Sequence, residues 1–393
     1  MLGLAAIVPT TPAAARVRPA RRAACDPRVP STCTLRQLAD RAGIRIGATL
    51  EPDQIDDPAY ADTLAREFSS LTPENAMKWY AIQDQRGVFT FDGADAVVAF
   101  AEAHGMAVRG HNLVWAQDQF TPDWVQGITD PSELWAAVTG EVDAVMGRYR
   151  GRVHRYDVLN EPIASLGTGP SASVFHRVLG PTWIADLFRY AHSVDPTAEL
   201  WLNEFGSDFV PGKRAALVDL VAGLVRDGVP IDGVGIQTHR YGTAGPDPDS
   251  YETMLRELTD LGVEVAVTEL DVATDPAVPT AFADQARAYD RIVRACLAVR
   301  GCTEVTTWGL TDASTWLDSF AFLPHPARPL LFDDAYRPKP AYDAVRLALA
   351  DRVLGRGQAT TTTTTTAVPS STTTTIPGAA GAVPIGGASA YTG

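Results

Sequence analysis

Two glutamates stand near the ends of short apolar runs, where their carboxyl groups could do chemistry. Glu161 lies in VHRYDVLNEP (153–162), and Glu269 lies in VEVAVTEL (263–270). Two opposed carboxyl groups can break a glycosidic bond, because one protonates the departing oxygen while the other meets the oxocarbenium-like carbon. Such a pair needs one carboxyl group that holds a proton near neutral pH and one that stays ionised.

Polar and aromatic residues also end most of the other apolar runs. They are Glu74, Asn75, His111, Trp115, Asn160, Asn203, Glu204, Gln237, His239, Asp271 and Trp308. Amides and imidazoles can hydrogen-bond sugar hydroxyls, and Trp115, Trp308 and Trp316 offer flat faces to sugar rings. Any one of these residues could instead be a helix N-cap or a satisfied loop carboxylate, but the same feature at seven run ends indicates a site. No set of three His or Cys ligands occurs, so we expect neither a catalytic metal nor a cofactor.

These residues need a scaffold that brings the run ends together. Eight apolar runs lie between about residues 36 and 352, at 44–50, 68–75, 106–115, 153–162, 199–205, 234–239, 263–270 and 304–310. The stretches between them are long enough for crossover helices, as at 215–228 and at 251–262, where Gly262 is a natural C-cap. Eight βα units predict an α/β fold, a single (β/α)8 TIM barrel whose active site forms at the C-terminal strand ends.

The two ends of the chain differ in composition from this middle, which leaves residues 25–356 for the barrel. Residues 1–24 contain an apolar stretch and an Ala-Ala-Ala cleavage pattern without a basic segment before it, so we expect either a truncated secretion signal or an ordinary flexible terminus. Residues 357–393 carry no charged side chain and contain two threonine runs. We expect a disordered tail there, either an O-glycosylated stalk or a segment without a role.

Composition limits the partners. The formal net charge is −14, and the lysines are only Lys78, Lys213 and Lys339. A nucleic-acid partner would need a basic patch and is not expected. No run of 18 apolar residues occurs, so we expect no transmembrane helix. We expect a secreted monomer, with attachment to a cell surface through the C-terminal tail as an alternative.

Four cysteines form two close pairs, Cys25 with Cys33 and Cys296 with Cys302, and neither pair has histidines at zinc-ligand spacing. In an exported protein such pairs are most simply disulfides. The alternative is that they are free buried thiols.

Seven collinear segments resemble motifs of glycoside hydrolase family 10, the endo-β-1,4-xylanases. They are LTPENAMKW (71–79), RGHNLVW (109–115), YDVLNEP (156–162), GIQTH (235–239), AVTELDV (266–272), TTWGLTDASTW (306–316) and PLLFDDAYRPKPAY (329–342). The pair Cys296 and Cys302 also resembles the family's disulfide. The resemblance, to the secreted bacterial type, implies an endo-acting retaining enzyme that cleaves xylan through a covalent glycosyl-enzyme intermediate.

The resemblance also implies roles for single residues. It makes Glu161 the general acid/base and Glu269 the nucleophile, with Asn160 on the sugar 2-hydroxyl. His239 would keep Glu269 ionised, and Asp271 would orient His239. The residues implied to bind sugars are Glu74, Asn75, Lys78, His111, Trp115, Gln237, Trp308 and Trp316.

The chain departs from the family pattern after Trp115, where Ala116 replaces the usual histidine and an insertion follows. Either Gln117 or Gln119 contacts sugar there, or both face solvent. Residues 317–328 are longer and more apolar than the usual loop.

These departures leave catalysis intact but put the preferred substrate in question. A related retaining glycosidase acting on another β-linked glucan is the alternative if residues 317–328 reshape the site. A non-catalytic polysaccharide-binding barrel is a third hypothesis, against which the presence of both glutamates with Asn160 and His239 argues.

Overall fold

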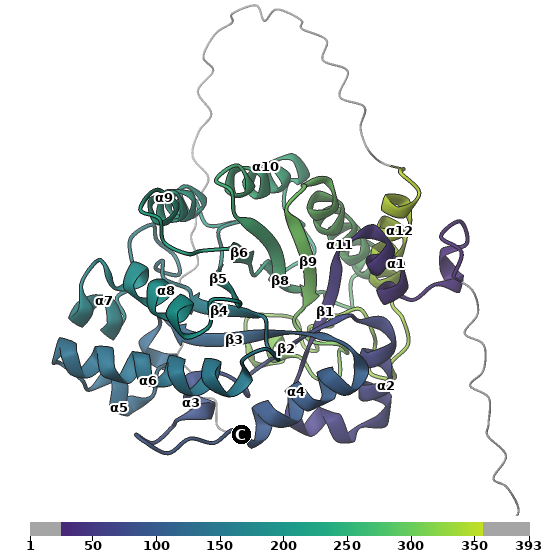
Figure 1. Ribbon diagram of the computed structural model, residues 1–393. Coiled ribbons are helices and arrows are strands. Elements are labelled where there is room, and N and C mark those ends of the chain that lie inside the picture. Colours follow the sequence, from purple (N-terminus) through teal and green to yellow (C-terminus); the bar gives the residue numbers. More distant parts are fainter. Residues whose placement is uncertain (1–24, 357–393) are drawn as a thin grey trace, which may run out of the picture. The chain divides into compact units, whose positions relative to one another are not determined.

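Eight parallel strands close into a barrel, and helices surround it (Figure 1). The computed structural model describes residues 25–356. The barrel strands are β1 (Arg45–Leu50), β2 (Ser70–Pro73), β3 (Ala107–Trp115), β4 (Arg155–Asn160), β5 (Glu199–Glu204), β6 (Gly233–Ile236), β8 (Glu264–Val272) and β9 (Cys302–Thr307). β6 pairs with β8 and β9 pairs with β1, so the ring is complete. The predicted TIM barrel is confirmed, with all eight apolar runs forming strands.

A two-residue strand, β7 (His239–Arg240), follows β6 and pairs with β8, where His239 lies opposite Asp271. This pairing carries the sheet beyond the end of β6 on one side of the barrel. It therefore places an imidazole next to the C-terminal half of β8.

Helices occupy the connections. They are α1 (Leu35–Ala42), α2 (Pro58–Glu67), α3 (Trp79–Ile82), α4 (Asp92–His104), α5 (Asp123–Gln126), α6 (Pro131–Tyr149), α7 (Val174–Leu179), α8 (Trp183–Val194), α9 (Lys213–Arg226), α10 (Pro248–Thr259), α11 (Ala281–Ala298) and α12 (Pro340–Val353). Asp247 caps α10 by accepting from the N–H of Ser250. This helix ends at Thr259 and not at the predicted Gly262, whose φ of 89° turns the chain toward β8. Within residues 25–356 no helix is both long and apolar enough to cross a membrane.

The barrel interior contains charged side chains, although strands buried on both faces are ordinarily aliphatic. The indole of Trp201 lies between two guanidinium groups, 4.8 Å from that of Arg109 and 4.1 Å from that of Arg155. Gly233 leaves the room for this ring, because a Cβ at that position would come within 2.4 Å of it. A small residue on one strand thus accommodates the largest side chain of its neighbour.

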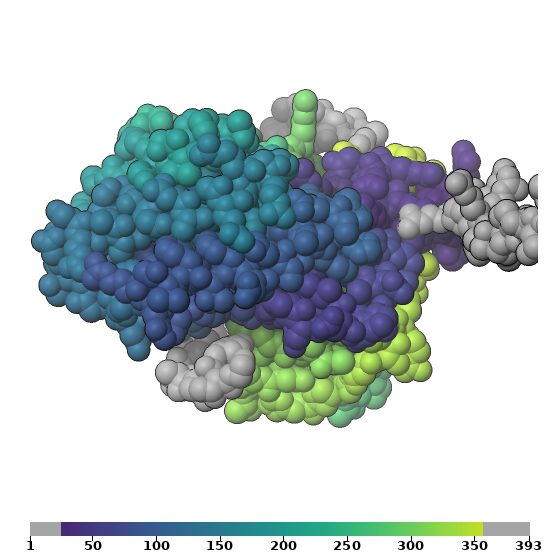
Figure 2. All heavy atoms as spheres, turned by 60° about the horizontal axis from the view of Figure 1, so that its bottom comes forward, coloured from purple at the N-terminus to yellow at the C-terminus, as the bar shows by residue number. Residues whose placement is uncertain are grey.

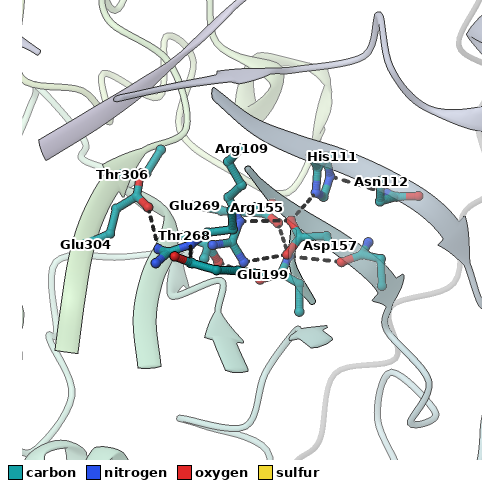
Figure 3. A network of polar contacts seen from close by, with 12 residues as sticks. Arg109, His111, Asn112, Arg155, Asp157, Glu199, Thr268, Glu269, Glu304 and Thr306 are labelled. Atoms are coloured by element: carbon teal, nitrogen blue, oxygen red, sulfur yellow. Dashed lines mark hydrogen bonds and ion pairs between the residues drawn. The ribbon is translucent and has the colours of Figure 1, made fainter. Parts of the chain in front are cut away.

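Arg155 ties the N-terminal strand ends together. Its guanidinium donates to Glu264 at 3.2 Å. It also donates to Glu199 at 2.6 Å and to Glu304 at 2.9 Å (Figure 3). These carboxylates come from β5, β8 and β9, while Arg155 belongs to β4. The network closes the end of the barrel that faces away from the predicted site, and residues at this end contribute to stability and not to catalysis.

The segment after β9 lies over the loops that follow β1. Figure 2 shows residues near 310–340, in light green to yellow, as one mass beside the purple N-terminal segment. Gln54, in η2 (Pro52–Asp56), donates to Ser314 at 3.3 Å, and the hydroxyl of Tyr336 donates to Asp57. These contacts join a segment near the beginning of the described chain to a segment near its end, at the rim of the barrel.

Both predicted disulfides are present. Cys25 bonds to Cys33 before α1, and Cys296 at the end of α11 bonds to Cys302 at the start of β9. The predictions about residues 1–24 and 357–393 lie outside the described residues.

Replacing both Cys296 and Cys302 by alanine should lower the free energy of unfolding by about 2 kcal/mol, since a short closed loop restricts the unfolded chain only modestly. Urea unfolding of this double variant would measure the change. The Cys25→Ala/Cys33→Ala variant would measure the contribution of the other bridge for comparison. An unchanged denaturation midpoint would show that the bridge contributes nothing.

Glu141, on α6, is a buried carboxyl group whose two oxygens have no hydrogen-bond partner within the described chain. Burial raises its pKa well above the ordinary value. The folded protein therefore binds a proton that the unfolded chain releases above about pH 4.5, so this group makes folding less favourable as pH rises toward its folded pKa.

Glu141→Met should consequently stabilise the fold by about 1–3 kcal/mol at pH 8 and by less at pH 5. Urea unfolding at the two pH values measures both gains. Glu133→Met, on the exposed part of the same helix, is the control and should leave the pH dependence unchanged. Equal gains at both pH values would contradict the raised pKa.

Candidate active site

Glu269 lies in the C-terminal half of β8 and is held from two sides. One carboxylate oxygen accepts from the amide of Asn203 at 2.5 Å, and the other lies 3.0 Å from Nε2 of His239. Nδ1 of His239 is in turn 2.9 Å from Asp271, which also accepts from the indole N–H of Trp316 at 2.7 Å. The side chains of Glu269, His239 and Asp271 are all buried, so their relative positions are fixed by packing as well as by hydrogen bonds.

The charges of this group follow from its contacts. Burial opposes a charged imidazole, but the carboxylates of Asp271 and Glu269 outweigh it and raise the pKa of His239 to about 10. Burial likewise acts to raise the pKa of Glu269, but the hydrogen bond from His239 and nearby cationic side chains lower it below the ordinary value. At neutral pH, His239 is an imidazolium and Glu269 is a carboxylate.

Glu161 follows β4 with a φ of 54°, a left-handed conformation that is unusual for a residue with a side chain. Its backbone N–H donates to the carbonyl of Asn203 at 2.9 Å, and its carboxyl group accepts from the amide of Gln237 at 2.9 Å. Burial raises the pKa of Glu161, and the negative charge of Glu269 acts in the same direction against the hydrogen bond from Gln237. The two carboxyl groups are therefore shifted in opposite directions.

Amide side chains link the two glutamates. The side chain of Asn203 donates to Asn160 at 2.9 Å as well as to Glu269, and it accepts from Thr268 at 2.6 Å. Gln237, bonded to Glu161, also lies 3.4 Å from the side-chain oxygen of Asn160. Asn203 was expected only as one of several polar strand ends, and its bridging position is the main site feature that the sequence did not indicate.

A buried ion pair lies behind Glu161. The ammonium of Lys213 is 3.0 Å from Glu204, and both side chains are inaccessible to solvent. Glu204 also accepts from the backbone N–H of Ile163 at 3.1 Å, in the loop after Glu161. Burial raises the pKa of Glu204 to about 7 even though Lys213 opposes the shift. The pair holds the start of this loop against β5 and α9.

A second polar wall is formed by the ends of β1 and β2. Glu74 accepts from Thr49 at 2.9 Å. The oxygen of the Asn75 side chain accepts from Lys78 at 3.0 Å and from Tyr80 at 2.8 Å, and its amide donates to Glu51. Glu51 did not stand out in the sequence. Burial and the neighbouring Glu74 raise its pKa to about 7, against the hydrogen bond from Asn75.

His111, in the middle of β3, is held by a carboxylate of the neighbouring strand β4. Its Nδ1 lies 2.9 Å from Asp157, which also pairs with Arg109 (Figure 3). Burial acts to raise the pKa of Asp157, but the charge of Arg109 and the contact with His111 lower it below the ordinary value. This buried carboxylate therefore connects the interior network with the imidazole at the rim.

The three candidate tryptophans have different surroundings. Trp115 stacks on Phe120 with ring centroids 3.7 Å apart, so one of its faces is already covered. Trp308 is buried edge-on against His111 at 5.2 Å. Trp316 remains partly exposed, with its ring 4.7 Å from that of His239. The ammonium of Lys78 lies 4.9 Å from the ring of Trp115 and 5.7 Å from that of Trp308.

The insertion after Trp115 separates the two candidate glutamines. Ala116 is buried, and Gln117 donates to Ser165 in the loop after β4 at 3.3 Å. Gln119 is exposed. The structure brings Gln117, but not Gln119, to the loop that follows Glu161. Whether either glutamine contacts sugar stays a prediction.

The described residues contain no group of three or more His, Cys, Asp or Glu side chains suited to holding a metal ion. The available chemistry is that of two carboxyl groups with opposed pKa shifts at the C-terminal rim of a (β/α)8 barrel. This arrangement is typical of glycoside hydrolases.

Comparison with known proteins agrees with this class. Residues 34–348 match glycosyl hydrolase family 10, and the chain belongs to this family. It is 33% identical over 326 residues to endo-1,4-beta-xylanase A of Phanerodontia chrysosporium, and the aligned residues are 82% of this chain and 78% of that protein. It is 38% identical over 286 residues to endo-1,4-beta-xylanase A of Fusarium oxysporum f. sp. lycopersici, with coverages of 70% and 86%. These relatives are fungal, so the expected bacterial type stays a prediction.

Solved structures give the same result. The native xylanase 10B from Thermotoga maritima superimposes with a TM-score of 0.78 at 32% identity, over 82% of this chain and 100% of that one. Xylanase 10B from Thermotoga petrophila RKU-1, in complex with xylobiose, has a TM-score of 0.77 at 31% identity, over 82% and 98%. The protein is a glycoside hydrolase by family and fold.

Proposed function

We propose that the protein is an endo-acting 1,4-β-xylanase that retains the configuration at the cleaved carbon. The observation that carries the proposal is a pair of buried carboxyl groups on one rim with different partners, Glu161 held by the amide of Gln237 at 2.9 Å and Glu269 by His239 at 3.0 Å. These surroundings raise the pKa of Glu161 and lower that of Glu269. A protonated acid and an ionised nucleophile are what double displacement requires. The relatives named as endo-1,4-beta-xylanases, and the solved complex with xylobiose, support xylan as the substrate.

In the first step the carboxylate of Glu269 attacks the anomeric carbon and forms a covalent ester. The bond from that carbon to the glycosidic oxygen breaks, and Glu161 gives its proton to this oxygen. In the second step the ionised Glu161 takes a proton from water, whose oxygen attacks the same carbon and releases Glu269. Two inversions leave the product in the β configuration.

The neighbouring residues have supporting roles in this proposal. Asn160, fixed by Asn203, meets the 2-hydroxyl of the sugar bonded to Glu269. His239 keeps Glu269 ionised, and Asp271 holds His239 in place. The sugars on the non-leaving side contact Glu74, Asn75, Lys78, His111, Trp115, Gln237, Trp308 and Trp316. Secretion, supported by the two disulfides, is part of the proposal.

Hydrolysis followed by proton NMR tests both parts of the proposal. Xylan and xylo-oligosaccharides should be cleaved internally, and the β anomer should appear before mutarotation produces the α anomer. If the α anomer appears first, the mechanism is inverting. Cleavage of carboxymethylcellulose in preference to xylan would instead identify a β-glucanase, and no cleavage of either would indicate a binding barrel.

The pH profile provides a prediction about His239. Because its hydrogen bond and charge lower the pKa of Glu269, His239→Asn should raise that pKa and move the acid limb of kcat/KM to higher pH. The descending limb, set by Glu161, should move less. The exposed His104→Asn is a control without effect. An acid limb in His239→Asn that coincides with that of the wild type would show that another group sets it.

A further inference from the structure

A hollow lies between α6 and α8 and is here called the α6–α8 hollow. Its volume is about 560 Å³, which is within the range of small-molecule binding sites. The two helices are neighbours on the outside of the barrel (Figure 1). The lining of the hollow includes three aromatic residues, Trp135, Trp183 and Tyr190, and three polar ones, Asp186, Arg189 and Ser193. The chemistry of the two glutamates uses none of these residues.

Two aromatic rings form a corner in the hollow. Trp135 and Tyr190 have ring centroids 6.0 Å apart and ring planes at 77° to each other. The hydroxyl of Tyr190, on α8, donates to Asp143, on α6, at 2.9 Å, so this ring is held across the two helices. Trp183 stacks on Phe175 with ring centroids 5.4 Å apart, which fixes the third ring. Because the rings are already held, a ligand that binds to them orders few side chains, which lowers the entropy cost of binding.

The polar groups of the hollow offer hydrogen bonds without a net charge. The carboxylate of Asp186 lies 3.7 Å from the guanidinium of Arg189, and both side chains are about half exposed. Arg189 also donates to the backbone carbonyl of Asp227 at 3.1 Å. The indole N–H of Trp135, a partly exposed residue, has no hydrogen-bond partner within residues 25–356. Donors and acceptors therefore lie next to flat apolar faces.

This combination suits a neutral sugar chain. A sugar ring has an apolar C–H face that can lie on an aromatic ring, and its hydroxyl groups both donate and accept hydrogen bonds. Trp183, Asp186, Tyr190 and Ser193 lie three or four positions apart on α8, so they share one face of the helix. This face extends over about 15 Å, which exceeds the width of one sugar ring. The formal net charge of −14 disfavours an anionic ligand.

We propose that the α6–α8 hollow binds a neutral segment of the polysaccharide substrate at a place separate from the cleavage site. This inference rests on the proposed function, since the glycan is taken to be the xylan that the two glutamates cleave. Glu161 and Glu269 lie at strand ends of the barrel, whereas the hollow lies between two of the surrounding helices. Binding there keeps the enzyme at the polymer and raises the local concentration of cleavable bonds without changing the chemistry.

Trp135→Ala and Tyr190→Ala test the proposal by binding. Each is combined with Glu269→Ala, which prevents turnover, and the loss of protein from solution onto insoluble debranched xylan is measured. The added substitution should weaken this binding about 5- to 20-fold relative to Glu269→Ala alone. Trp135→Phe keeps a flat aromatic face and should retain most of the binding.

The same substitutions in the active enzyme separate binding from catalysis. At low substrate loading they should lower the rate on insoluble xylan about 3- to 10-fold, while kcat/KM for xylohexaose stays within twofold of the wild type. Phe89→Ala is the matched control, because Phe89 is 40% exposed and stacks on Phe91 at 6.0 Å in the segment before α4. It should change neither the binding nor the rates.

Three results would overturn the proposal. One is unchanged binding to xylan in both alanine variants. Another is an equal loss of rate on insoluble xylan and on xylohexaose, which would show a structural role for the two rings. The third is a lower sedimentation coefficient with unchanged xylan binding, which would identify the hollow as a contact between two copies of the chain. If the active enzyme cleaves neither xylan nor xylohexaose, the proposed function fails, whereas the binding measurement still tests the hollow.

Discussion

Glu269→Ala should abolish turnover of every substrate, by about 10⁴-fold or more in kcat. Without this carboxylate no covalent intermediate forms, and no leaving group is good enough to remove the need for it. The loss should therefore be the same for xylan and for aryl β-xylobiosides. Mass spectrometry of the wild type trapped with a 2-fluoro-xylobioside should show the sugar attached at Glu269.

The alanine variant also offers a chemical test of the same role. Removing the side chain leaves space beside His239 and Asn203, so added azide should attack from that side and form the α-glycosyl azide. Glu264→Ala is the control on the same strand, since Glu264 lies at the opposite end of β8 and pairs with Arg155. Residual activity in Glu269→Ala within tenfold of the wild type would assign the nucleophile to another residue.

The fold and the positions of the two glutamates at its rim could be predicted because each rests on local sequence. Eight apolar runs with intervening helical stretches define the barrel, and the polar residues at their ends define its rim. Membership of the family, which the motifs indicated, is confirmed by the match over residues 34–348. These features depend on neighbours in the chain, which a single sequence displays directly.

Contacts between distant strands could not be predicted in the same way. Asn203 reaches Glu269 across 66 positions of sequence, and nothing in β5 alone shows which way its amide turns. A weak signal exists in Gly235 of β6, where a Cβ would come within 2.2 Å of the Asn203 side chain. This glycine makes room for the bridging amide, but its meaning is clear only once the strands are paired.

The lysines carried another signal. Only Lys78, Lys213 and Lys339 occur in the chain, and all three are buried, at 6%, 0% and 6% exposure. Lys213 pairs with Glu204, and Lys339 pairs with Asp312 at 2.7 Å. Because the surface uses arginine almost exclusively, a lysine here marks a buried cation. The low lysine content argues against nucleic-acid binding, but the burial of each lysine is visible only in the folded chain.

Glu161→Ala should give a loss that depends on the leaving group. Xylan, whose leaving group is a sugar hydroxyl, needs a proton from Glu161, and kcat/KM should fall by about 10²- to 10⁴-fold. An aryl xylobioside with an acidic phenol leaves without protonation, so its first step should be nearly unchanged. Loss of the general base then slows the second step, and the covalent intermediate should accumulate as a burst of phenol.

The same variant should lose the descending limb of its pH profile on the aryl substrate, because that limb reports ionisation of Glu161. Azide should accelerate the second step and yield the β-glycosyl azide, opposite in configuration to the product from Glu269→Ala. Glu204→Gln serves as the comparison, since its carboxyl group lies behind Glu161 and pairs with Lys213. It should reduce the rates on both classes of substrate together. Only loss of the proton donor itself should make the fall in rate depend on the acidity of the leaving group. An equal fall in kcat/KM on xylan and on the aryl xylobioside in Glu161→Ala would therefore show that Glu161 is not the general acid/base.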